Sequence, residues 1–100
     1  MATGTIKNQH TGTWTEVNAN LKYQVRSGIV FVWARASAAS ASSWAVIGTL
    51  PTAVIPVFDV FLTCFTGTTD SNFRINYTDG KVSFYGANTG ATALFSYPLP

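Results

Sequence analysis

The chain has 100 residues, of which 47% are hydrophobic, 14% aromatic and only 10% charged. This length fits one domain, and the composition excludes a disordered chain, because disordered chains are rich in charge and poor in aromatic residues. The net charge of +2 comes from scattered Lys and Arg residues, which excludes the clustered basic face typical of nucleic-acid binders. No apolar run reaches the roughly 20 residues of a membrane-spanning helix, and no signal peptide is visible, so we expect no membrane partner.

The first third of the chain predicts an arm followed by three strands. Residues 1–13 are small and polar and are expected to form an amino-terminal arm or stem remnant, and 14–17 a short strand. Alternating apolar and polar residues over 21–26 predict a half-buried strand. Ser27-Gly28 predicts a tight turn into a strand over 29–36, which is apolar on both faces. Such a strand is typically covered on both sides, by a second sheet or by a neighbouring subunit.

The middle of the chain predicts two more strands. A loop of small residues over 37–43 precedes a strand over 44–50. Two prolines then bracket a turn over 50–56, since proline lacks the amide that a strand ladder needs. Residues 57–65 predict a strong strand that is apolar on both faces apart from Asp59.

The last third alternates short strands with polar loops. The predicted order is a polar loop over 66–72, a strand over 73–78, a hairpin turn at Asp79-Gly80, a strand over 81–85, a second polar loop over 86–92 and a closing strand over 93–97. The whole pattern gives seven or eight short strands. We therefore predict an all-β fold, an antiparallel β-sandwich or jelly-roll-like head domain over residues 14–100.

Residues for catalysis and metal binding are scarce. His10 is the only histidine and lies in the polar arm, which disfavours a catalytic triad, and with Cys64 the only cysteine one chain cannot supply a tetrahedral zinc site. We interpret His10 as a solvated arm residue and Cys64 as a small buried hydrophobic residue. The prediction is no catalytic residue, no metal and no cofactor.

The acidic residues leave one catalytic alternative. Asp79 is assigned to the hairpin turn, and Asp59, if buried, needs a cationic partner such as Arg35 or Arg74. A pair of Asp59 and Asp70 is compatible with glycoside hydrolysis, which uses two carboxylates about 5–10 Å apart. A small polysaccharide hydrolase is therefore kept as the least favoured function.

Residues suited to saccharide binding are better represented. An exposed aromatic side chain stacks on the C–H face of a sugar, while amides and charged groups bind its hydroxyls. The candidates lie in predicted loops or at loop edges that we expect to share one end of the sandwich: Trp44, Asp70, Asn72, Arg74, Tyr85 and Asn88. The alternative is structural, because tryptophans in small β domains usually lie in a core or interface, and asparagines are common turn residues.

The order of several motifs carries a resemblance over 14–100. It consists of W-x-x-V, Y-x-V-R-x-G-I-V-x-V (23–32), G-T-L-P-x-x-x-x-P (48–56), I-x-x-x-D-G-K-V-x-F (75–84) and a terminal F-S-Y-P. This series resembles the carboxy-terminal head domains of tailed-phage tail fibres and baseplate receptor-binding proteins. The chain departs from that pattern at 53–55, where such heads often have Gly-Tyr-Arg and this sequence has Ala-Val-Ile.

The resemblance implies a homotrimeric head at the tail tip or baseplate of a virion, binding a saccharide of the host cell wall. It also implies a fragment, whose missing amino-terminal stem would contact other tail or baseplate proteins. Ligand positions vary within such heads, so no site residue is carried over. A structural tail component without a ligand is the alternative.

The shortage of charge independently favours association. The predicted strands over 29–36 and 57–65 require more apolar cover than one chain of this size readily provides. Obligate interfaces resemble a domain core, so an oligomer would supply that cover.

Overall fold

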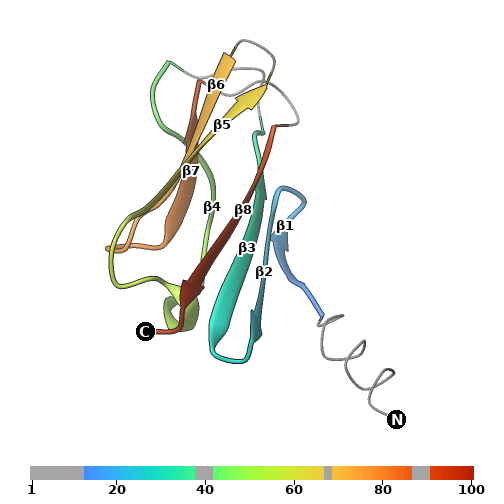
Figure 1. Cartoon of the computed structure of the whole chain (residues 1–100), viewed down its shortest axis with the longest axis vertical. Coiled ribbons are helices and arrows are strands. Elements are labelled where there is room, and N and C mark those ends of the chain that lie inside the picture. The colour runs from blue at the N-terminus through green and yellow to red at the C-terminus, as the bar shows by residue number, and fades with distance from the viewer. Residues whose placement is uncertain (1–12, 38–41, 67–68, 87–90) are drawn as a thin grey trace.

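The structure is a computed structural model that describes residues 13–37, 42–66, 69–86 and 91–100. Across these ranges, two four-stranded antiparallel sheets pack face to face as a sandwich (Figure 1). Sheet A has the order β1-β2-β3-β8 and sheet B the order β4-β7-β6-β5. The strands are β1 Thr15–Asn18, β2 Leu21–Arg26, β3 Ile29–Arg35, β4 Ala45–Thr49, β5 Val60–Thr66, β6 Thr69–Ile75, β7 Lys81–Tyr85 and β8 Thr92–Pro98. The predicted fold class, an all-β antiparallel sandwich, is confirmed.

A short 3-10 helix, η1 (Thr52–Val54), lies between β4 and β5, where the sequence predicts a turn between two prolines. In the part of the chain that the structure describes, no helix has the length and apolar character needed to cross a bilayer.

The β2–β3 hairpin follows directly from its sequence. Ser27 and Gly28 both have positive φ, 52° and 78°, which gives the two-residue turn whose twist matches that of paired strands. The carbonyl of Gly28 also accepts a hydrogen bond of 2.8 Å from the Leu99 amide, so the carboxy-terminal end is held beside this turn.

The core forms between the inward faces of the two sheets. On β3 the buried positions alternate, and Val30, Val32 and Ala34 have no exposed surface. On the central strands of sheet B, Phe73 and Phe84 are paired in register and also have none. The core comprises Leu21, Val30, Val32, Ala34, Ala36, Ile47, Leu50, Val54, Phe73, Ile75, Val82, Phe84, Ala91, Ala93, Phe95 and Tyr97.

One bound of the apolar strands differs from the prediction, and the cover expected on their outward faces is not provided within the single chain. The strand predicted from residue 57 begins at Val60. The outward side chains of β3, including Phe31 and Trp33, are half-buried and not covered by a second layer. None of the three tryptophans lies in the core, because all three are on outward faces or at a strand end. The apolar surface that the sequence predicts to be covered is therefore partly open in the single chain.

The predicted polar loop over 66–72 is also wrong. Residues 60–66 and 69–75 pair in an unbroken antiparallel register, from Val60 opposite Ile75 to Thr66 opposite Thr69. The sequence does not indicate this strand because one of its inward positions is Ser71, a polar residue that is fully buried and interrupts the apolar–polar alternation. Asp70 and Asn72 are consequently strand residues.

The predicted Asp79-Gly80 hairpin joins β6 to β7 through a longer turn than two residues. The Asn76 amide donates to the Lys81 carbonyl and the Gly80 amide to the Asn76 carbonyl, which closes a four-residue loop. The Asp79 carboxylate accepts the Lys81 amide at 3.0 Å, as expected for a turn residue.

Replacing Gly80 with alanine is expected to destabilise the domain by about 2–3 kcal/mol, because a non-glycine residue at positive φ is strained. Gly80 has φ 76°, and an added Cβ would lie 2.8 Å from the Ile55 side chain and 3.0 Å from the Leu50 carbonyl oxygen. Gly28 is the matched control, since it has φ 78° but nothing within 4 Å of an added Cβ. Urea unfolding should show a larger loss for Gly80→Ala than for Gly28→Ala, and equal losses would contradict the close packing at Gly80.

The side of the sandwich formed by β1 and β4 is closed by a side-chain link between the sheets. The Asn18 Nδ2 donates to the Ile47 carbonyl at 2.9 Å. Gly48 allows this approach, because an added Cβ would lie 2.8 Å from both Asn18 Nδ2 and Leu21 Cδ2. This link fixes β4, and with it the position of Trp44, relative to the rest of the fold.

Candidate functional site

The outward face of sheet B brings together most of the predicted saccharide-binding residues. Strand pairing places Arg74 between Phe61 on β5 and Ser83 on β7, and it places Asn72 between Thr63 and Tyr85. Trp44 directly precedes β4, the edge strand beyond β7. We call the group of Trp44, Phe61, Asn72, Arg74 and Tyr85 the sheet B platform.

The indole of Trp44 lies across the sheet. Its ring centroid is 6.4 Å from that of Phe61 in an edge-on arrangement and 5.8 Å from that of Tyr85. Phe61 is on β5, the edge strand at the opposite side of sheet B, about 14 Å away at the usual spacing of strands. The indole therefore extends over β7 and β6 towards β5, and Phe61 reaches back to meet it.

A small residue on the outward face of β7 leaves room for the indole. Ser83 points outward, in register between Val46 and Arg74, yet only 2% of it is exposed. A large side chain there would lift the indole away from the sheet. Trp44 itself remains 37% exposed and Phe61 61% exposed, so the platform presents aromatic surface to solvent.

The guanidinium of Arg74 stacks on this aromatic group. Its central carbon lies 4.5 Å from the Trp44 ring centroid, within the range of a cation–π interaction. Its Nε is buried without a hydrogen-bond partner, and no described carboxylate forms an ion pair with it. Stacking thus orients the guanidinium, and Arg is well suited to donate two parallel hydrogen bonds.

The amide of Asn72 forms the polar border of the platform. Its Oδ1 accepts a 3.0 Å hydrogen bond from the Thr63 hydroxyl, and its Nδ2 donates to the Tyr85 carbonyl at 3.4 Å. These bonds link β5, β6 and β7 across the outer face. The long donor contact to Tyr85 is the weaker one and is the one a ligand oxygen can replace most easily.

Four of the six predicted binding residues are therefore close together: Trp44, Asn72, Arg74 and Tyr85. They share one face of sheet B and not, as predicted, a group of loops at one end of the sandwich. Asp70 lies on the same strand, opposite Phe65, but its side chain is outside the described residues. Asn88 also lies outside them.

Phe61 and Ser83 belong to this site and were not predicted. Phe61 is in a run of apolar residues that indicates core, and only the strand register places it on the outward face. Ser83 has a signal in the sequence, since it is a small residue at an outward position of a strand rich in larger residues.

The backbone positions of Asp59 and Asp70 are far apart in sheet B. Asp59 is exposed, and its Oδ1 accepts the Tyr77 amide at 2.9 Å instead of pairing with Arg35 or Arg74 as proposed from the sequence. It precedes β5, whereas Asp70 is opposite Phe65, six residues further along that strand. At about 3.4 Å per residue this is about 20 Å, too far for the roughly 5–10 Å of a glycosidase pair.

The described ranges contain no group of three or more His, Cys, Asp or Glu side chains able to hold a metal ion. His10 and the side chain of Cys64 lie outside what the structure describes, so the predictions made for them stay untested.

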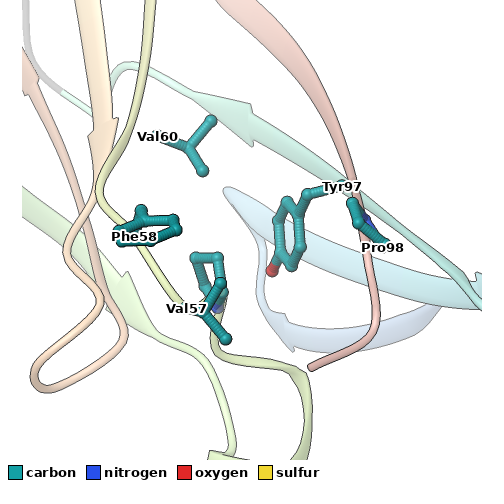
Figure 2. Close-up of a pocket in the computed structure, with 6 residues that line it drawn as sticks. Val57, Phe58, Val60, Tyr97 and Pro98 are labelled. Carbon is teal, nitrogen blue, oxygen red and sulfur yellow. The ribbon is translucent and has the colours of Figure 1, made fainter.

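A second feature is an apolar cavity of about 310 Å³ at the β5–β8 side of the sandwich (Figure 2). It is lined by Pro56, Val57, Phe58, Val60, Tyr97 and Pro98. The Tyr97 hydroxyl donates to the Val54 carbonyl at 2.6 Å, and burial raises the pKa of this hydroxyl well above its usual value. Tyr97 thus remains a neutral hydrogen-bond donor and fixes one wall of the cavity.

Comparison with known proteins finds no family model, no curated protein and no solved structure that matches this chain significantly.

Proposed function

We propose that this chain is the saccharide-binding head domain of a phage tail receptor-binding protein, and that the sheet B platform is its binding surface. The observation that carries the proposal is the stacking of Arg74 on Trp44, with Phe61 and Tyr85 completing the aromatic surface. The order of motifs over residues 14–100, which resembles such heads, supports the placement in a tail fibre or baseplate. The function is binding, without a catalytic step.

The chemistry of the platform suits a sugar. Aromatic rings provide a large rigid surface at small entropic cost, since each has two side-chain torsions. The axial C–H groups of a pyranose stack on such a surface. The terminal N–H groups of Arg74 and the amide of Asn72 lie beside it and can hydrogen-bond the hydroxyls at the rim of the ring.

The proposal includes assembly of the head into a homotrimer at the tail tip, joined to other tail or baseplate proteins through a stem on its amino-terminal side. Apolar residues on the outward faces support association, because isolated soluble domains rarely keep so many uncovered. A trimer also compensates for a low affinity at each saccharide site, since several sites engaging one cell surface bind with increased avidity.

The full chain, fluorescently labelled, should be applied to an array of bacterial surface polysaccharides with neutral, acidic and phosphorylated repeats. We expect saturable binding to a narrow set of these. A flat signal across the array, with no difference from an unrelated labelled protein, would contradict the proposal and favour a structural component without a ligand.

A further inference from the structure

The two open sides of the sandwich differ in how their edge strands are protected. On one side β1 has four residues and β4 has five, both have an interrupted register, and Asn18 links them. Short length and bulges are devices that prevent an edge strand from pairing with another chain. This side is therefore closed to further strands.

The opposite side, formed by β5 and β8, lacks those devices. Each strand has seven residues and pairs with its single neighbour in an unbroken register. Neither strand contains a charged residue, and the one proline is Pro98 at the last position of β8. Long, regular and uncharged edges present free backbone donors and acceptors to another strand.

Among the described residues, the most exposed large apolar side chains belong to the strands of this side or to the segment before β5. They are Phe58 at 75%, Phe61 at 61%, Val57 at 59% and Leu94 at 58% exposure. All four are on β5, on β8 or in the segment directly before β5. The apolar cavity lies between the start of β5 and the end of β8, as Figure 2 shows.

We propose that the β5–β8 side is the surface through which a second copy of this chain binds. This inference rests on the association of copies in the proposed function and names the surface that carries it, while saccharide binding is not needed for it. In a trimer, each free β5 or β8 edge can meet a free edge of a neighbouring copy.

The size and charge of the surface fit a second copy. Without Phe61, which belongs to the sheet B platform, the exposed parts of Val57, Phe58, Leu94 and Leu99 supply roughly half of the roughly 800 Å² that each partner contributes to a stable interface. The six residues that line the cavity are uncharged, so two identical copies can meet there without a charged lining side chain facing its own counterpart.

The test compares oligomeric mass in three forms of the full chain by light scattering after size exclusion. We expect the unchanged chain to have a multiple of its 10.7 kDa mass. The double variant Phe58→Lys/Leu94→Lys should fall to a single chain. Val46→Lys is the matched control: Val46 is 51% exposed but lies on β4, so this variant should keep the multiple.

A second measurement covers the case in which the double variant misfolds. Amide hydrogen exchange of the unchanged chain at high and low concentration should show protection that rises with concentration in β5 and β8 and not in β1 and β4. A single-chain mass for the unchanged protein, or protection that rises elsewhere, would overturn the inference. Absence of saccharide binding would contradict the proposed function alone, and neither Phe58 nor Leu94 is part of the sheet B platform.

Discussion

Replacing Phe73 with alanine is expected to lower the free energy of unfolding by about 3–5 kcal/mol, the usual cost of removing a buried phenylalanine ring. Phe73 has no exposed surface and is paired with Phe84 on one side and with Leu62 on the other. These residues fill the layer between the two sheets, and β-sandwich walls relax little around a cavity. Since small domains are stable by about 5–15 kcal/mol, this loss is a large fraction of the total.

The control for this prediction is Phe73→Leu, which keeps most of the buried apolar volume. It should cost clearly less than Phe73→Ala, because it leaves a smaller cavity. Urea unfolding followed by far-ultraviolet circular dichroism measures both variants at one protein concentration, so that association affects them equally. Similar small losses in both would show that Phe73 is not at the centre of the core.

The second large effect is expected at Trp44. Trp44→Ala should raise the dissociation constant for the saccharide by at least about 30-fold, which corresponds to the roughly 2 kcal/mol loss that defines an energetically dominant contact. The indole supplies the largest ring of the platform and the surface on which Arg74 is stacked. Its removal therefore takes away the stacking surface and releases the guanidinium from its orientation.

Trp14→Ala is the matched control, because Trp14 is 38% exposed and Trp44 is 37% exposed. Both substitutions remove the same side chain from a similarly exposed position, and Trp14 lies directly before β1 in the other sheet. Titration calorimetry with a polysaccharide selected from the array should show weakened binding for Trp44→Ala alone. Equal affinity in the two variants would place the binding surface elsewhere.

Strands and turns that depend on residues adjacent along the chain can be predicted from the sequence. The alternation over 21–26 and the Ser27-Gly28 dipeptide specify strand, turn and strand within a few residues, and the structure follows them. The β6–β7 hairpin was predicted for the same reason. The alternation is interrupted where an inward residue is polar, as at Ser71, and the sequence therefore predicts a loop where the first half of β6 lies.

The sequence predicts only part of the candidate site, because the site depends on which strands become neighbours. The sequence indicates that the side chains of Trp44, Asn72, Arg74 and Tyr85 suit a binding site, but it predicts that they meet in loops at one end of the sandwich. The order β4-β7-β6-β5 is not the order along the chain, and it is this order that places Tyr85 and Arg74 between Trp44 and Phe61. Such pairing is a long-range property that periodicity within a segment does not contain.

The sequence shows a low content of charge, and the structure shows where the corresponding apolar surface is left uncovered. Strands apolar on both faces were expected to be covered on both sides. In the single chain they are covered on one side, and the four most exposed large apolar side chains of the described residues lie on β5, on β8 or directly before β5. The surface that we propose to bind another copy is therefore one side of the sandwich, formed by β5 and β8.

The indole N–H signals of the three tryptophans provide the most direct test of the sheet B platform as a saccharide site. In a two-dimensional ¹H–¹⁵N spectrum, the full chain is titrated with a polysaccharide selected from the array, and the signals are assigned with Trp14→Phe and Trp33→Phe variants. Binding at the platform predicts a saturable shift of the Trp44 signal, with the Trp14 and Trp33 signals unchanged. An unchanged Trp44 signal at saturation, or a shift confined to Trp14 or Trp33, would contradict it.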